Sequence, residues 1–384
     1  MTAGTAAPGQ WRALATIISS VAVMGVTYAL TMPLISLRME ARGIDSTLIG
    51  LNATMATIGM ILIPPLIPAI LRRTGVKALL LSCHAGTAVC LLLFAFVDWI
   101  PAWFGLRIVL SAFLSGLFVV SEAWINHLAG PAERGRILGI YASSLAAGFA
   151  TGPLLLQVTG VDGITPFVTG VGILGLAATP VLLARGEEPP LAGHPSRGVL
   201  AFAAAAPTAT MAALVFGAIE AGVLALMPIY GVQTGLEPAM AAAMAAAVGA
   251  GNVALQVPIG WLADRTDARW MLALCAVAGL ACAAALPFTV GSVWVWVVLF
   301  LAGGVMMGLY TLGLTLLGER FSGPDLAAAN GAFVSTYGLG ALGGPLLTGG
   351  AMDLVPPYGL PLMLGAFCLA FLLVAVPRTL AGKT

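Results

Sequence analysis

The sequence contains very little charge. Only 8% of its 384 residues are Asp, Glu, Lys or Arg, while 60% are hydrophobic. A soluble domain carries about 25% charged residues, so this chain has too few to cover a surface that faces water. We therefore expect an integral membrane protein. The formal net charge of +1 gives no reason to expect nucleic acid as a partner.

Residues and motifs of catalytic and metal sites are also scarce. The chain has three histidines, and its five cysteines all lie inside apolar runs without a CxxC pair. This pattern indicates buried thiols rather than a metal or redox site. No nucleotide-binding loop or nucleophile–base pair is present. The sequence thus predicts neither an enzyme nor an ATP-driven pump, and no cofactor.

Long apolar runs dominate what remains. A helix needs about 20 apolar residues to cross a bilayer, and on this basis the sequence predicts twelve transmembrane helices in an all-α fold. The predicted spans are 13–37, 47–70, 77–98, 101–127, 136–160, 163–184, 200–230, 238–262, 270–290, 292–317, 327–350 and 357–377.

The distribution of Lys and Arg predicts the orientation. If the N-terminus is cytoplasmic, thirteen of these residues lie on the cytoplasmic side, and only Arg38 and Arg42 lie outside. Cytoplasmic loops of membrane proteins carry such an excess. We expect a multi-pass monomer in the cytoplasmic (inner) membrane, surrounded by lipid, with both termini in the cytoplasm.

The chain contains an internal repeat. The polar stretch RGEEPPLAGHPSRG, residues 185–198, predicts a cytoplasmic linker between six-helix bundles at 1–184 and 199–384. Residues match at an offset of 192: Gly116 with Gly308, and Gly139 with Gly331. Two parallel repeats related by an axis along the membrane normal are typical of transporters whose substrate site lies between the halves.

The segment Gly260-Trp-Leu-Ala-Asp-Arg265 resembles the G-x-L-A-D-R signature of the major facilitator superfamily. With twelve spans and a central linker, the resemblance covers nearly the whole chain. It implies that fold, two pseudo-symmetric six-helix bundles, and secondary transport by alternating access. It also implies that Asp264 and Arg265 hold a cytoplasmic gate. In the equivalent stretch of the first half, Arg72 stands where the signature has its Asp, and Arg73 stands where it has its Arg. We therefore expect an asymmetric gate.

A second motif recurs in both halves. In the first half it resembles the G-x3-G-P motif of the superfamily's drug:proton antiporters, but duplication and close helix packing would also produce it. The motif comprises Gly148, Gly152 and Pro153, and again Gly340, Gly344 and Pro345.

Glu220 is the sharpest candidate for mechanism. It lies well inside the seventh predicted span, with no Lys or Arg within a helical turn or two. An ionisable residue inside a span is costly and is a functional candidate by default. A carboxyl group in this environment should bind a proton near neutral pH, as proton coupling requires. It could equally serve as the counter-ion of a cationic substrate, or be a neutral Glu bonded to a neighbouring helix.

Arg107 resembles the fourth-span arginine that superfamily antiporters use in proton handling. It shares a helix face with Ser111, Ser115, Phe118 and Glu122. This face is predicted to line the substrate cavity. Because Arg107 lies near the outer end of its span, it could instead extend outward to the lipid headgroups.

Glu122 lies at the cytoplasmic end of the same span, one loop before Arg134 and Arg136. Three interpretations stay open: an ion pair that closes the cytoplasmic side, a second protonation site, or simple placement at the interface.

Uncharged polar residues in other spans complete the predicted substrate cavity, although any one could instead bond a neighbouring helix. They are Tyr28, Thr31, Asn252, Gln256, Tyr310, Thr311, Thr336 and Tyr337.

The leading hypothesis is a secondary active transporter of a small organic molecule, with protons as the coupling ion and export slightly favoured. An uptake symporter or uniporter is the main alternative. A copper importer is a minor one, since Met240 and Met244 have i, i+4 spacing and Met is also a common packing residue. A membrane receptor or scaffold would be the non-transport alternative.

Overall fold

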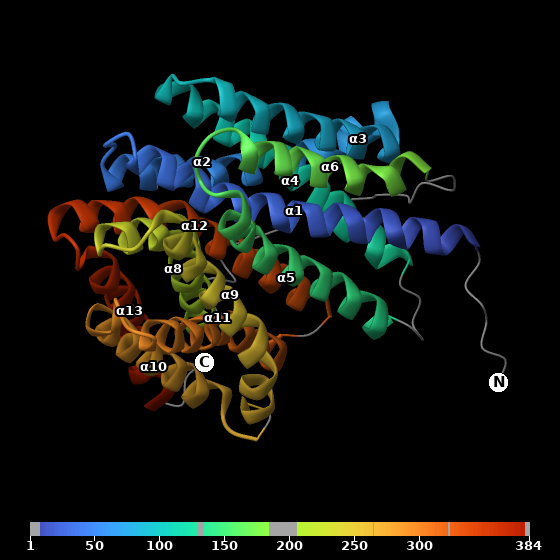
Figure 1. Cartoon of the computed structure of the whole chain (residues 1–384). Coiled ribbons are helices and arrows are strands. Elements are labelled where there is room, and N and C mark those ends of the chain that lie inside the picture. The colour runs from blue at the N-terminus through green and yellow to red at the C-terminus, as the bar shows by residue number, and fades with distance from the viewer. Residues whose placement is uncertain (1–7, 129–133, 184–205, 264, 322, 381–384) are drawn as a thin grey trace. The chain divides into compact units, whose positions relative to one another are not determined.

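The computed structural model describes the backbone of residues 8–128, 134–183, 206–263, 265–321 and 323–380. In these ranges the regular structure consists of twelve long α-helices and one short 3-10 helix (Figure 1). The elements are α1 (Pro8–Glu40), α2 (Ser46–Leu62), η1 (Pro64–Leu66), α3 (Ile67–Phe96), α4 (Ile100–Leu128), α5 (Arg134–Thr159), α6 (Thr165–Leu183), α8 (Pro207–Gln233), α9 (Pro238–Ala263), α10 (Ala268–Thr289), α11 (Trp294–Arg320), α12 (Gly323–Leu354) and α13 (Gly359–Leu380).

The predicted all-α membrane fold is confirmed. Within the described residues, eleven segments are long and apolar enough to cross a bilayer. The predicted span 327–350 is also helical, as part of α12, but is not among these eleven. Its many glycines lower its mean hydropathy while allowing other helices to approach closely.

The second and third predicted spans meet inside α3. Gly75 has φ 77° and ψ 166°, which is not helical, and it divides α3 into two helical parts. The apolar segments on either side are Ser46–Thr74 and Val76–Phe96. A positive φ is easily adopted only by glycine, so Gly75 ends one span and lets the next begin at once.

The chain divides by its internal contacts into two compact units. Unit 1 comprises residues 1–31 and 55–194, and unit 2 comprises residues 32–54 and 195–384. Two helices therefore contribute to both units: α1 passes from one to the other at Thr31, and α2 at Thr54. The linker predicted at 185–198 lies outside the described residues, and the division into bundles 1–184 and 199–384 stays a prediction.

The contacts within each unit repeat at the offset of 192 found in the sequence. A Cβ atom placed on Gly116 would lie 2.6 Å from Cys83 Sγ, and one on Gly308 would lie 2.8 Å from Cys275 Sγ. Other helix pairs behave in the same way. The equivalent contacts are Gly25 to Leu145 O and Gly217 to Tyr337 O, Gly59 to Ile108 O and Gly251 to Phe300 O, and Gly148 to Ala22 O and Gly340 to Leu214 O.

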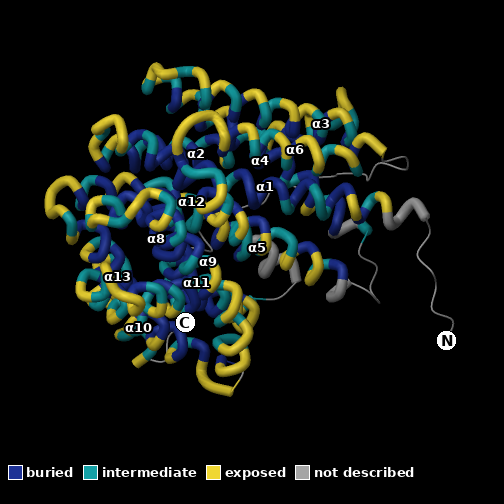
Figure 2. The backbone as a smooth tube through the Cα atoms, in the orientation of Figure 1, coloured by how far each residue is buried: buried dark blue, intermediate teal, exposed yellow. Residues whose placement is uncertain are grey.

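Burial follows this packing. Most of α8 is buried, and Figure 2 shows it dark blue along much of its length. By contrast, large apolar side chains such as Val257, Phe288 and Leu176 are at least 75% exposed. Exposed apolar side chains of this size suit a helix bundle whose solvent is lipid.

Candidate functional site

The most informative polar contact in unit 2 joins α8 to α12. Tyr337 Oη donates a hydrogen bond of 2.6 Å to Glu220 Oε2. The two helices approach closely because glycines face their partner's backbone at Gly217 and Gly340. Small residues on both sides thus bring the carboxylate within reach of the phenol.

Other aromatic rings pack against the ring of Tyr337. The centroid of Tyr337 lies 5.9 Å from that of Phe216 and 6.0 Å from that of Tyr310. Tyr310 also packs edge-on against Phe333, at 5.1 Å. We call Phe216, Tyr310, Phe333 and Tyr337 the aromatic cluster. Phe216 and Phe333 are buried, whereas the two tyrosines are partly exposed.

Among the described residues of unit 2, no Lys or Arg side chain pairs with the carboxylate of Glu220. Its polar contact there is the hydrogen bond that Tyr337 donates. An O–H···O⁻ bond of this length is typical of a charge-assisted hydrogen bond. Proton transfer to Glu220 would remove that charge without breaking an ion pair. Chemically, the site is suited to gaining and losing a proton, or to binding a positive group.

Two other predicted cavity residues of unit 2 bond each other. Thr311 Oγ1 on α11 donates to Gln256 Oε1 on α9, at 3.0 Å. Thr336 instead donates to Ala332 O of its own helix. Gln256, Thr311 and Thr336 are all partly exposed, as is Asn252. Their contact with substrate stays a prediction.

Arg107 in unit 1 is buried, with only 1% of its surface exposed. Its Nη1 donates to the carbonyl oxygen of Thr31 on α1, at 3.0 Å. Tyr28, one turn earlier on α1, interacts electrostatically with the guanidinium and packs edge-on against Phe149. The alternative in which Arg107 extends to the headgroups is therefore wrong, because its guanidinium is enclosed by protein.

The serines that share the helix face of Arg107 are buried as well. Ser111 and Ser115 are 1% and 2% exposed, and Ser115 Oγ donates to Met60 O at 3.0 Å. Glu122, at the other end of this face, is exposed. Ser115 thus contributes to helix packing in this structure, and a role of either serine in the cavity stays a prediction.

The predicted gate is described only in part. Asp264 and the side chains of Arg134 and Arg136 lie outside the described residues. Arg265 is exposed, and its guanidinium lies 3.5 Å from the centre of the Trp261 ring, a cation–π contact. Arg72 and Arg73 are exposed. The gate role of these residues and of Glu122 stays a prediction.

A polar cluster that no sequence motif indicated lies where α1 ends and α2 begins. The carboxylate of Asp353 on α12 accepts bonds from Ser46 and Thr47 on α2. Nearby, Gln233 Nε2 lies 3.3 Å from Glu40 Oε1. One signal was available: an acid in the last turn of a helix opposes its own helix dipole, so Asp353 needed a partner.

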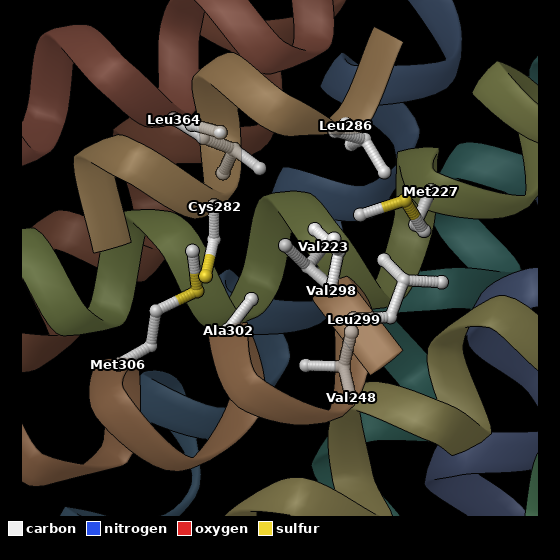
Figure 3. Close-up of a pocket in the computed structure, with 11 residues that line it drawn as sticks. Val223, Met227, Val248, Cys282, Leu286, Val298, Leu299, Ala302, Met306 and Leu364 are labelled. Atoms are coloured by element: carbon white, nitrogen blue, oxygen red, sulfur yellow. The ribbon is translucent and has the colours of Figure 1, made fainter. Parts of the chain in front are cut away.

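A small cavity in unit 2 is separate from these groups. Its lining is aliphatic or sulfur-containing, and none of the predicted substrate-cavity residues belongs to it (Figure 3). The lining residues are Val223, Met227, Val248, Cys282, Ala283, Leu286, Val298, Leu299, Ala302, Met306 and Leu364. This cavity offers no hydrogen bonds to a polar substrate.

The two methionines behind the copper alternative have different surroundings. Met240 is 44% exposed, whereas Met244 is fully buried. Within the described residues, no three His, Cys, Asp or Glu side chains are grouped so that they could hold a metal ion.

Comparison with known proteins identifies relatives along most of the chain. The family model described as Major Facilitator Superfamily matches residues 17–251 and 209–383. The uncharacterized MFS-type transporter YfkF of Bacillus subtilis is 26% identical over 347 residues, which cover 87% of both chains. The uncharacterized MFS-type transporter YcaD of Escherichia coli is 26% identical over 311 residues, covering 78% of this chain and 77% of its own.

Solved structures share the fold at low sequence identity. The nucleoside transporter NupG has a TM-score of 0.79 and 14% identity, and the match covers 97% of this chain and 99% of NupG. A D-xylose-proton symporter has a TM-score of 0.72 and 15% identity, over 94% and 95% of the two chains.

Proposed function

The chain belongs to the major facilitator superfamily and is a multi-pass membrane transporter, and we propose that it moves a small organic molecule by alternating access, coupled to protons. Glu220 is the proposed coupling group. The cell membrane it occupies is proposed to be the cytoplasmic (inner) one, with both termini on the cytoplasmic side.

The contact between Glu220 and Tyr337 carries this proposal. A carboxyl group inside a span is costly and persists where it has a function. Here its partner is a neutral phenol, at 2.6 Å. A carboxylate paired with Lys or Arg would keep its charge, whereas this one can change charge when it binds a proton. Arg107, buried in unit 1, is proposed to assist proton handling.

The aromatic cluster supports an organic substrate. Its partly exposed tyrosines offer ring faces and hydroxyl groups beside the carboxylate. Sites for small molecules commonly combine apolar and aromatic walls with a few polar groups. Export is slightly favoured because of the antiporter-like G-x3-G-P motif. The alternative direction is uptake. A D-xylose-proton symporter shares the fold of this chain.

The test begins by finding a substrate. Purified protein is screened against a compound library by thermal shift at two pH values, since a ligand that binds the folded state stabilises it. Each hit is then tested in proteoliposomes that contain a pH-sensitive dye, with and without an imposed pH gradient.

Glu220→Gln is expected to abolish substrate-dependent proton flux while the protein still folds and inserts. Glu237→Gln is the matched control, because Glu237 is exposed and precedes α9. Wild-type proton flux in Glu220→Gln would overturn the coupling role. If the wild-type protein transports substrate at the same rate with and without the pH gradient, a uniporter would be favoured.

A further inference from the structure

Asp353 joins α12 to the first turn of α2. Its Oδ1 accepts a hydrogen bond of 2.9 Å from Ser46 N, and its Oδ2 accepts one of 2.7 Å from Thr47 N. Thr47 Oγ1 donates a third bond to Oδ2, at 2.5 Å. Both carboxylate oxygens are therefore used by a helix that lies more than 300 residues away in the sequence.

The charge on the Asp353 carboxylate is stabilised only while the first turn of α2 lies against it. Asp353 precedes the last residue of α12, where the partial negative charge of the helix end disfavours a carboxylate. The first backbone N–H groups of α2 supply the opposite partial charge and lack partners within their own helix. Asp353 thus acts as an N-cap for α2 that is supplied from another helix.

The backbones around this cap are closely packed. A Cβ on Gly349 would collide with Ser46 O, and one on Gly50 would collide with Pro345 O. One turn further along α2, Thr54 Oγ1 donates to Leu342 O at 2.9 Å. Residues 32–54 belong to unit 2 through contacts of this kind, although they come from the first half of the sequence.

Other charged and polar side chains lie near the cap. Glu40 interacts electrostatically with Asp353, and the two carboxylates repel each other. The side-chain amide of Gln233 donates to Glu40 Oε1 and to Ser46 Oγ, each at 3.3 Å. Hydrogen bonds from the backbone and from the Thr47 hydroxyl group thus link Asp353 to α2 directly.

We propose that Asp353 is a latch residue, which holds residues 32–54 against α8 and α12 in one conformation of the transport cycle and releases them in another. The latch lies at the C-terminal ends of α1, α8 and α12. This inference rests on the proposed alternating access, but it does not depend on which ion or substrate is carried.

The test measures opening directly, without substrate. Ala53 is 2% exposed and shares a face of α2 with Ser46 and Gly50. In a variant whose five native cysteines are replaced, Ala53→Cys reports opening through its rate of reaction with a maleimide. Because this readout needs neither substrate nor a pH gradient, it fails or succeeds independently of the proton-coupling test.

Asp353→Asn is expected to raise the labelling rate on the order of fivefold, the change in equilibrium that losing one cap produces. Asp45→Asn is the matched control. Asp45 Oδ1 also caps α2, by accepting from Leu48 N at 2.7 Å, but it belongs to the same chain segment and links no other helix. No rise in Asp353→Asn, or an equal rise in Asp45→Asn, would overturn the proposal.

A second measurement applies even if Asp353→Asn does not fold. Thr47→Val removes only the hydroxyl donor, and a smaller rise in labelling is expected.

In addition, a Cβ on Gly350 would lie 3.9 Å from Thr47 Oγ1, so Thr47→Cys with Gly350→Cys should form a disulfide, detected by mass spectrometry. Leu48→Cys with Gly350→Cys is the control pair, and equal cross-linking in both pairs would contradict the latch geometry.

Discussion

Glu220 on α8 occupies the position of the second repeat that Tyr28 occupies on α1 in the first, 192 residues earlier. The helix contacts around the two positions are equivalent, since Gly25 meets Leu145 O and Gly217 meets Tyr337 O. The duplicated framework therefore presents a phenol in one unit and a carboxyl group in the other. Packing was kept in both repeats, while the polar chemistry diverged.

The hydroxyl of Tyr337 is expected to matter more than its ring. Tyr337→Phe keeps the contacts with Phe216 and Tyr310 but removes the donor to Glu220. A hydrogen bond to a charged group contributes about 1.5–3 kcal/mol, so we expect proton-driven transport to fall by about tenfold. Initial rates in proteoliposomes measure this. Tyr358→Phe, at an exposed position, should leave the rate unchanged, and equal losses in both variants would contradict the assignment.

Removal of the buried guanidinium is expected to destabilise unit 1. Arg107→Met loses the charge-assisted bond to Thr31 O, at an expected cost of about 1–3 kcal/mol. Thermal unfolding of the purified protein would show a lower Tm. Arg72→Ala removes an exposed charge and should change stability by less than about 0.5 kcal/mol. An unchanged Tm in Arg107→Met would show that the bond adds nothing to stability.

A side chain at position 340 is expected to disrupt the packing of α8 against α12. Gly340→Ala would collide with Leu214 O, and overpacking of this kind costs about 1–3 kcal/mol. Gly343→Ala is the control in the same helix, because its Cβ would meet no atom within 4 Å. We expect a lower Tm for the first variant, and for the second an unchanged or slightly higher one, since Ala favours helix over Gly.

The Asp353 bonds predict a pH dependence. Burial alone would raise the pKa of Asp353, but the hydrogen bonds from Thr47 and Ser46 prevail and hold it below its ordinary value. These bonds therefore add stability above the ordinary pKa of about 3.9, and the addition is lost as pH falls through the lowered value. The Tm difference between wild type and Asp353→Asn should shrink as pH falls below about 4. A difference that persists undiminished in acid would contradict this.

The sequence predicted the fold well because the bilayer imposes one requirement on every span. Apolar runs located all twelve helices, including the glycine-rich α12. Helix ends were less predictable. Gly75, for example, terminates a span through its backbone conformation, which the apolar runs do not reveal.

The site was predicted less completely, since its contacts join residues far apart in the chain. Glu220 was conspicuous because it is a lone acid in an apolar run, and Tyr337 appeared only among several possible cavity residues. The partner that encloses Arg107 is a backbone carbonyl, Thr31 O, which no side-chain pattern reveals. Asp353 and Ser46 are 307 residues apart, and only folding brings them together.

The helix α1 has a mechanical consequence. It passes from unit 1 to unit 2 after Thr31, and two residues later it contains Pro33. Proline lacks the N–H that would bond the carbonyl four residues earlier, so a helix bends there at a lower energy. The backbone of α1 thus lacks one helical hydrogen bond within two residues of the point where the chain passes from unit 1 to unit 2.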